Sequence, residues 1–311
     1  MKLVFCGTPQ FAVPTLQALI AAGHEIALVI SQPDRPVGRS QQLTPPPVKQ
    51  TALMAGLEVT QPEKIKNNTD FRARLELIEP AAIVVVAYGR IIPPWMLSLP
   101  RLGCINLHAS LLPKYRGAAP IQWAVAMGET VTGNTTMLLE EGLDTGPILL
   151  QQEIPIAPGQ MAAELFDVLA KAGAPLVVKT LGGLDDRTIT PKQQDYSRAT
   201  LAPILTRDDG RMDFEKYTAR EIWNRWRGFH PWPGAHTSLD GKKLIVHRMQ
   251  VAAKDGPAEP GIVELLNGTI VVACAQGTWI EVTELQLEGK KRMTAAEFLR
   301  GAALKSGARL G

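Results

Sequence analysis

Cysteine, aromatic residues and long apolar runs are all scarce in this chain. The three cysteines, Cys6, Cys104 and Cys274, are odd in number and widely spaced, so no disulfide framework is expected. Cys6 and Cys104 lie in apolar runs typical of strands, and we expect them to be buried and unreactive. No Cys or His spacing resembles a zinc site, so we expect no metal. No apolar run approaches the roughly 20 residues of a membrane span. The N-terminal run is too short for a signal peptide, which predicts a cytoplasmic protein.

A glycine-rich dinucleotide motif is also missing. The turn after the first apolar run, CGTPQF, lacks the G-x-G-x-x-G spacing that lets a pyrophosphate approach the backbone.

The net charge is only +3, but its distribution is uneven. Residues 204–311 carry 16 Lys and Arg against 13 Asp and Glu, whereas residues 1–203 carry 17 of each. This basic excess is compatible with a polyanionic partner.

Apolar runs and amphipathic segments alternate over the first two-thirds of the chain. Strands are expected at KLVFCG, HEIALVIS, LEVT, AAIVVVAYG, INLHAS, TTMLLE and QQEIPI. Helices are expected at PQFAVPTLQALIAAG, DFRARLELIE, APIQWAVAMG and MAAELFDVLAKAGAPLVVKTLGGL. The alternation predicts a Rossmann-like α/β domain over residues 1–189, with a mostly parallel sheet and helices on both faces. Residues 32–48, which contain Pro, Gly and Arg, are expected to form a long loop without regular structure.

The pattern changes in the last third. Residues 190–206 are polar and lack periodicity, which predicts a linker. Residues 207–311 then show short strands with turn signals, which predict a small antiparallel β-barrel of the OB-like type. The turn signals are Asp240-Gly241, Asn267-Gly268 and Gln276-Gly277. Two helices are expected to begin with capping boxes, Thr218 with Glu221 and Thr294 with Glu297.

Three polar residues in two short segments offer a chemical site. Asn106 and His108 are alternate residues of the expected strand INLHAS, so they share a face at its carboxyl end. Asp144 follows in a separate turn, GLDTG. An amide donor, an imidazole and a carboxylate together can polarise a carbonyl, stabilise an oxyanion and move a proton. We therefore expect a catalytic site built from Asn106, His108 and Asp144.

The motif around these residues resembles the folate-dependent formyltransferase family. It reads N-x-H-x-S-L-L-P, then Y-R-G-A-A-P-I-Q, then G-L-D-T-G. Further matching segments are CGTPQFA, QPDRPVGR, VVVAYGRIIP and FHPWPGA, so the resemblance covers nearly the whole chain. QPDRPVGR and FHPWPGA are similar to the members of this family that act on methionyl-tRNA.

The resemblance implies transfer of a formyl group from 10-formyltetrahydrofolate to the α-amine of methionyl-initiator tRNA, for translation initiation. Asn106, His108 and Asp144 match the family's catalytic triad. The segment that contacts folate in the family matches Ser110, Leu111, Leu112 and Pro113. The resemblance implies no metal and no covalent enzyme intermediate. We further expect a monomer.

Basic residues are expected to contact the tRNA. Arg39 matches the basic residue of the loop that enters the acceptor end in the family, and Arg35 lies nearby. Ser40, Gln41 and Gln42 follow, where some members have Gly-Lys-Lys, so the loop carries fewer phosphate-binding charges. Candidates in the C-terminal domain are Lys242, Lys243, Arg248, Lys290, Lys291 and Arg292.

Other readings of the same residues remain open. A formyltransferase could act on a nucleotide-linked amine, such as glycinamide ribonucleotide or a UDP-amino sugar. A hydrolase could cleave 10-formyltetrahydrofolate with water as the acceptor, since the triad does not distinguish the two. A non-catalytic RNA-binding protein is a further alternative, and it predicts that tRNA binding survives the loss of His108.

Overall fold

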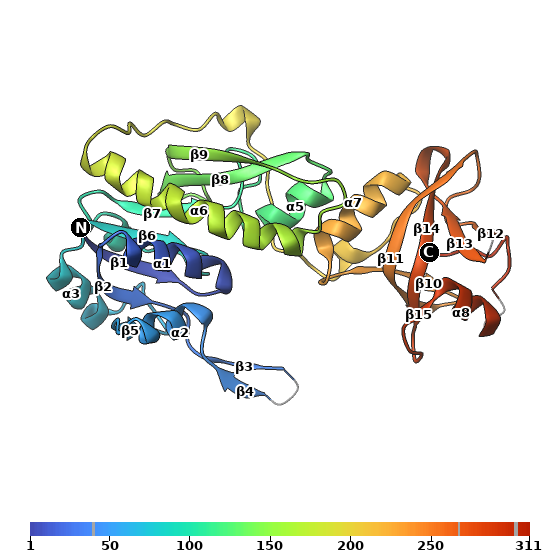
Figure 1. Ribbon diagram of the computed structural model, residues 1–311, viewed down its shortest axis with the longest axis horizontal. Coiled ribbons are helices and arrows are strands. Elements are labelled where there is room, and N and C mark those ends of the chain that lie inside the picture. The colour runs from blue at the N-terminus through green and yellow to red at the C-terminus, as the bar shows by residue number, and fades with distance from the viewer. Residues whose placement is uncertain (39–40, 267, 302–303) are drawn as a thin grey trace. The chain divides into compact units, whose positions relative to one another are not determined.

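The structure is a computed structural model that describes residues 1–38, 41–266, 268–301 and 304–311 (Figure 1). The chain divides into two compact units. The first unit contains Met1–Pro120, Val131–Pro155 and Leu165–Pro203. The second contains Ile121–Thr130, Ile156–Glu164 and Ile204–Gly311, so two short segments from the middle of the chain pack with its C-terminal third.

A seven-stranded sheet forms the centre of the first unit, in the order β5-β2-β1-β6-β7-β8-β9. Its strands are β1 (Lys2–Gly7), β2 (Glu25–Ile30), β5 (Val59–Thr60), β6 (Ala82–Val86), β7 (Cys104–His108), β8 (Val131–Leu138) and β9 (Ile148–Pro155). The five strands from β5 to β7 run parallel, whereas β8 and β9 pair antiparallel. The predicted mostly parallel sheet is therefore confirmed.

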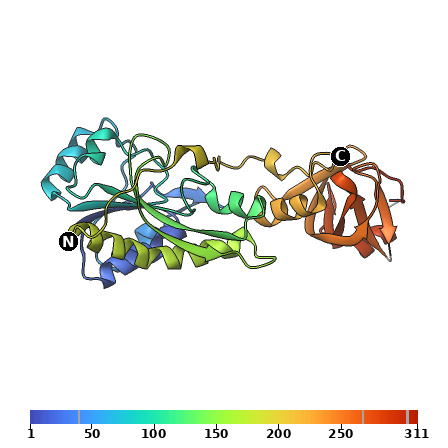
Figure 2. The same ribbon diagram turned by 90° about the horizontal axis from the view of Figure 1, so that it is seen from above.

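Helices cover both faces of this sheet, as Figure 2 shows. One face packs Val4 and Val85 against Phe71 of α3 and Met96 of α4. On the other face, Leu107 lies against Gly173 of α6. Burial on both faces explains why the central strands are apolar at nearly every position. The helices of this part of the chain are α1 (Val13–Ala21), α2 (Pro47–Met54), α3 (Thr69–Ile78), α4 (Pro94–Leu97), α5 (Pro120–Ala126) and α6 (Ala162–Asp185), with a short 3-10 turn at Gln10–Ala12.

The loop expected over residues 32–48 is not structureless, and that prediction was wrong. Strands β3 (Arg35–Val37) and β4 (Gln42–Thr44) form an antiparallel hairpin that projects from the unit in Figure 1. Helix α2 then begins at Pro47. The prolines suggested a break, but proline is favoured at the first position of a helix because that position needs no amide hydrogen. Arg39 and Ser40 lie outside the described residues.

An antiparallel sheet forms the second unit, in the order β10-β11-β14-β13-β12, with β15 paired to β14. Its strands are β10 (Ala235–Leu239), β11 (Lys242–Asp255), β12 (Val263–Leu266), β13 (Thr269–Ala273), β14 (Thr278–Leu287) and β15 (Met293–Thr294). Its helices are α7 (Ala219–Phe229) and α8 (Ala295–Gly301). Short 3-10 turns lie at Tyr196–Arg198, Asp208–Gly210 and Ala275–Gly277. The predicted antiparallel sheet is confirmed.

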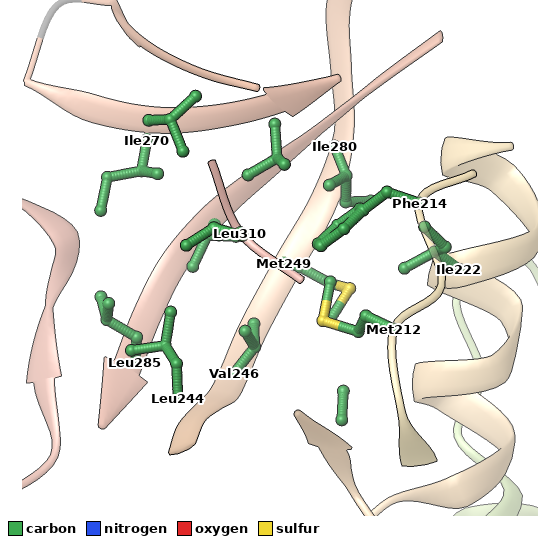
Figure 3. Close-up of a cluster of buried hydrophobic side chains, with 14 of the residues drawn as sticks. Met212, Phe214, Ile222, Leu244, Val246, Met249, Ile270, Ile280, Leu285 and Leu310 are labelled. Atoms are coloured by element: carbon green, nitrogen blue, oxygen red, sulfur yellow. The ribbon is translucent and has the colours of Figure 1, made fainter. Parts of the chain in front are cut away.

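Side chains from several strands and α7 fill the core of the second unit (Figure 3). Phe214, Ile222, Val246 and Leu285 all belong to this cluster, and all four are buried. The predicted turn at Asp240-Gly241 joins β10 to β11, and both residues have positive φ, 49° and 73°. Such a pair matches the twist of the flanking strands, which explains the choice of Asp-Gly.

Both predicted capping boxes are present. Thr218 Oγ1 accepts from the Glu221 amide at 3.3 Å, and the Glu221 carboxylate accepts from the Thr218 amide at 2.8 Å. Thr294 and Glu297 exchange the same two bonds at 3.2 and 2.8 Å. Each box satisfies amides that a helix start would otherwise leave unpaired.

Candidate active site

The carboxyl end of β7 carries two buried polar side chains. Asn106 is 9% exposed and His108 is 6% exposed. Asn106 and His108 are two and four residues after Cys104, so all three side chains share one face of β7. Cys104 packs on the face of the sheet that α3 and α4 cover. Polar groups at such a position need partners or a function, because burial removes their water. Open α/β sheets bind ligands at the carboxyl ends of their strands, so this end of β7 is the first place to look for chemistry.

The hydrogen-bond partner of one ring nitrogen determines the tautomer of His108. Its Nε2 lies 2.9 Å from the carbonyl oxygen of Tyr115. A carbonyl only accepts hydrogen bonds, so Nε2 must carry a hydrogen and donate it. In the neutral ring, the lone pair is then on Nδ1. The nitrogen able to take or give a proton is therefore Nδ1.

Asp144 faces that nitrogen. Its Oδ2 lies 3.7 Å from His108 Nδ1, longer than a hydrogen bond but close enough for a strong charge interaction. The same oxygen accepts from the Gly117 amide at 2.8 Å. Asp144 has a φ of +49°, a left-handed conformation that Asp tolerates better than most residues. The structure thus brings together His108 and Asp144, as the sequence predicted.

The amide of Asn106 completes the set. It shares a strand face with His108 two residues away, and no hydrogen bond joins its side chain to another described residue. An uncommitted NH₂ group can donate to an oxygen that gains negative charge. The three side chains can thus polarise a carbonyl and move a proton next to it.

The segment predicted to contact folate follows directly after β7. Ser110 and Leu112 are buried, whereas Leu111 and Pro113 are half-buried. Ser110 Oγ donates to the carbonyl of Lys114 at 2.6 Å. Ser110 and Leu112 therefore shape the segment from within, and Leu111 and Pro113 are the members with surface to offer a ligand.

Two residues that the sequence analysis missed hold this segment. Thr135 Oγ1 of β8 donates to the Ser110 carbonyl at 2.6 Å and accepts from the Leu112 amide at 3.1 Å. Gln151 of β9 donates to the Leu112 carbonyl at 2.9 Å. Both side chains come from the antiparallel edge of the sheet, and no local sequence motif marked them.

Hydrogen bonds also join the carboxyl ends of the other parallel strands. Thr8 Oγ1, after β1, donates to the Tyr88 carbonyl, after β6, at 3.0 Å and accepts from the Gln32 amide, after β2, at 3.3 Å. Gln32 Nε2 donates to the same Tyr88 carbonyl at 3.2 Å. The side chains of Thr8 and Gln32 therefore connect the segments that follow β1, β2 and β6.

Two family models match the chain. The model described as formyl transferase matches residues 1–181, and the model described as formyl transferase, C-terminal domain, matches residues 204–303. The chain belongs to the formyl transferase family. A protein of Acidobacterium capsulatum named methionyl-tRNA formyltransferase is 66% identical over 311 residues, the whole of both chains. One of Koribacter versatilis with the same name is 54% identical, over 100% of this chain and 99% of the relative.

A solved formyl transferase shares the fold. WlaRD, a sugar 3N-formyl transferase whose structure was determined in the presence of dTDP and 5-N-formyl-THF, has a TM-score of 0.65 at 18% identity. The comparison covers 94% of this chain and 99% of that chain. The fold of the formyl transferase family is thus retained at low sequence identity.

Basic residues of the second unit gather on β11 and beside it. Four of the lysines predicted to contact tRNA are exposed there: Lys242, Lys243, Lys290 and Lys291. The Glu288 amide donates to the Lys243 carbonyl at 2.8 Å, which places the start of β11 next to the turn after β14. Arg292 and Arg248 both pair with the carboxylate of Glu284, the first through Nε at 2.7 Å. One carboxylate therefore offsets part of their charge. In the first unit, Arg35 is exposed on β3.

All three cysteines are free and buried, which confirms the predicted burial of Cys6 and Cys104. Burial raises the pKa of Cys104 and of Cys274 to about 12, and it raises the pKa of Cys6 well above its ordinary value, with the neighbouring Cys104 adding to the effect. Among the described residues, no three His, Cys, Asp or Glu side chains gather as they would around a metal ion. Within the same residues, no helix is both long and apolar enough to cross a membrane.

Proposed function

We propose that the chain transfers the formyl group of 10-formyltetrahydrofolate to the α-amine of methionyl-initiator tRNA. The product is N-formylmethionyl-tRNA, which serves translation initiation in the cytoplasm. The observation that carries this proposal is the pair of full-length relatives, 66% and 54% identical, that are both named methionyl-tRNA formyltransferase. The choice of a formylated folate as the formyl donor is supported by WlaRD, because the structure of WlaRD was determined in the presence of 5-N-formyl-THF.

The reaction forms one C–N bond and breaks another. The amine of methionine attacks the formyl carbon, and the formyl oxygen takes up negative charge. The NH₂ group of Asn106 donates to this oxyanion, and the protonated Nδ1 of His108 supplies a second donor. Collapse of the intermediate breaks the bond from carbon to the folate nitrogen and releases tetrahydrofolate. Positioning of the two bound substrates supplies much of the rate.

Proton transfer falls to His108 and Asp144. Because Nε2 of His108 already donates to the Tyr115 carbonyl, only Nδ1 can exchange a proton with the substrates. The carboxylate of Asp144 lies 3.7 Å from Nδ1, where it can accept the proton of the attacking amine, directly or through water. That proton returns to the folate nitrogen as it leaves.

In this proposal, the formyl donor 10-formyltetrahydrofolate lies against the segment that follows β7. Leu111 and Pro113 provide the contact surface, while Ser110 and Leu112 keep the segment in shape. Thr135 and Gln151 hold that shape from β8 and β9. The proposed division of labour predicts that changes at Leu111 alter the KM for the folate more than changes at Ser110 do.

The tRNA contacts the hairpin and the second unit in this proposal. Arg35 lies on β3 of the hairpin, and Arg39 is a further proposed contact that lies outside the described residues. The lysines at the start of β11 and after β14 are exposed and can reach phosphates: Lys242, Lys243, Lys290 and Lys291. Arg292 joins them with a charge that Glu284 partly offsets.

We also propose that the second sheet curls into an OB-like barrel. Strand β11 pairs with β10 over its first residues and with β14 from Leu244 to Asp255, with register shifts on the way. Such irregularities bend a strand and let one sheet close on itself. OB-like barrels commonly bind nucleic acids.

A panel of acceptors tests the proposal. The protein would be mixed with 10-formyltetrahydrofolate and, separately, methionyl-initiator tRNA, methionyl-elongator tRNA, glycinamide ribonucleotide and a UDP-amino sugar. We expect a formylated product with the initiator tRNA alone. Formylation of a small amine would overturn the tRNA acceptor, and folate release without any acceptor would indicate a hydrolase.

A further inference from the structure

The stretch between the two matched family models is part of the active-site architecture. Those models end at residue 181 and resume at residue 204. Within this interval, Leu201 forms a parallel bridge with Arg116, and the Arg116 amide donates to the Thr200 carbonyl at 2.9 Å. The chain after α6 therefore runs back alongside the loop that follows β7, instead of leaving the first unit directly.

Gln194 lies in this stretch and is 4% exposed. Its Nε2 donates to the carbonyl of Asp144 at 2.8 Å and to the carbonyl of Gly146 at 2.7 Å. Its Oε1 accepts from Nε and Nη2 of Arg116 at 3.1 and 2.7 Å. Because arginine can only donate and carbonyls can only accept, the orientation of the Gln194 amide is unambiguous.

Arg116 holds the other end of this chain of contacts. The residue is 6% exposed, and its guanidinium carbon lies 4.7 Å from the ring centre of Tyr196. No carboxylate forms an ion pair with it among the described residues, so the neutral Gln194 oxygen is its polar partner there. A buried charge held by one amide oxygen makes that amide costly to move.

The same short loop also touches both proton-carrying residues. The carbonyl of Tyr115 accepts from His108, and the amide of Gly117 donates to Asp144. Arg116 lies between these two residues and anchors Gln194, which grips the Asp144 turn from its backbone side. The left-handed backbone of Asp144, with φ +49°, is a conformation that needs such external support.

We infer that Gln194 is a positioning residue for the reaction, holding the Asp144 turn by its two carbonyls and taking its own orientation from Arg116. The inference deepens the proposed function and rests on it for the identity of the substrates. It predicts that the carboxylate of Asp144 keeps its place beside His108 Nδ1 only while the Gln194 amide donates both hydrogen bonds.

Gln194→Glu separates this role from a general structural one. Glutamate keeps two oxygens for Arg116, so the buried cation stays paired, but it has no hydrogen to donate to the Asp144 and Gly146 carbonyls. Gln193→Glu is the matched control, because it makes the same change at an exposed neighbour. Both variants would be compared with the wild type in kcat, in the KM for each substrate, in melting temperature and in hydrogen exchange of residues 140–149.

We expect the kcat of Gln194→Glu to fall by about 100-fold, as displacements near 1 Å in an active site do, while the KM values and melting temperature stay near those of the wild type. Exchange should accelerate in residues 140–149 alone. Gln193→Glu should match the wild type. A wild-type kcat together with unchanged exchange would overturn the inference. So would a loss of kcat explained entirely by a lower folded fraction.

The exchange measurement needs no substrate, so it keeps this inference separable from the proposed function. If the wild type formylates another acceptor, the proposed function fails while the exchange result still decides whether Gln194 holds the Asp144 turn. Should Gln194→Glu prove insoluble, Gln194→Asn replaces it, since its shorter side chain cannot reach Arg116 and both carbonyls at once. The same readouts then apply.

Discussion

Removing the charge of Asp144 while keeping its shape probes the centre of the mechanism. In Asp144→Asn, the side-chain oxygen can still accept from the Gly117 amide, which in the wild type donates to the Asp144 carboxylate at 2.8 Å. The substitution therefore leaves the turn supported. It removes the negative charge beside His108 Nδ1 and the group that accepts the amine proton.

The size of the effect follows from the geometry. Two unit charges separated by the 3.7 Å between Oδ2 and Nδ1 attract by about 4 kcal/mol at an effective dielectric constant of roughly 20. Both side chains are largely buried, so solvent screens the pair only in part. Loss of about 4 kcal/mol from the transition state corresponds to roughly a 1000-fold lower rate. The amide dipole and water recover part of this, and we expect kcat to fall between about 100-fold and 1000-fold.

The assay is a single turnover with excess protein, both substrates saturating, and separation of formylated from free methionyl-tRNA at each time point. Asp186→Asn is the control, because it removes the same charge from an exposed side chain of the first unit. Melting temperatures of both variants should stay near that of the wild type. An Asp144→Asn protein that turns over within threefold of the wild type would refute the assigned role of the carboxylate.

Three further predictions concern stability and reactivity. The three buried thiols, whose pKa values burial raises, should resist iodoacetamide at pH 8 in the native protein and should all react in denaturant. Rapid labelling of the native protein, detected by mass spectrometry, would contradict this. Burial lowers the pKa of His236 below its ordinary value of 6.5, so its stability contribution is full above pH 6.5 and is lost as pH falls. His236→Gln should flatten that acid slope in thermal melts, and an unchanged slope would exclude His236 as a cause. Thr218→Ala should cost about 1 kcal/mol in urea unfolding through loss of the α7 cap, and no loss would mean that the cap is energetically silent.

The elements that could be predicted from sequence are those specified locally. Apolar runs predicted the central parallel strands, because a strand buried on both faces is apolar throughout. The capping boxes at Thr218 and Thr294 and the Asp240-Gly241 turn were predictable for the same reason, since all their partners lie within a few residues. The hairpin of β3 and β4 was not predicted because its strands are only three residues long, and the residues of β4 are all exposed, so that no buried face imposes alternation on that strand.

In the candidate site, too, the features specified locally could be predicted and those that depend on the fold could not. Asn106 and His108 stood out because a strand places alternate residues on one face. The contacts that orient them were not predictable, since they use backbone atoms, such as the Tyr115 carbonyl and the Gly117 amide, whose direction depends on the folded loop. Gln194 lies 50 residues beyond Asp144 in a stretch that has the composition of a linker, so only the fold reveals that the two meet.

Product formation by the wild type and by His108→Ala, measured side by side with tRNA and folate binding, tests the central claim most directly. We predict that the wild type makes N-formylmethionyl-tRNA, and that His108→Ala binds both substrates with similar affinity but loses turnover by orders of magnitude. Wild-type turnover in His108→Ala, or tRNA binding by the wild type with no formyl transfer at all, would contradict the account.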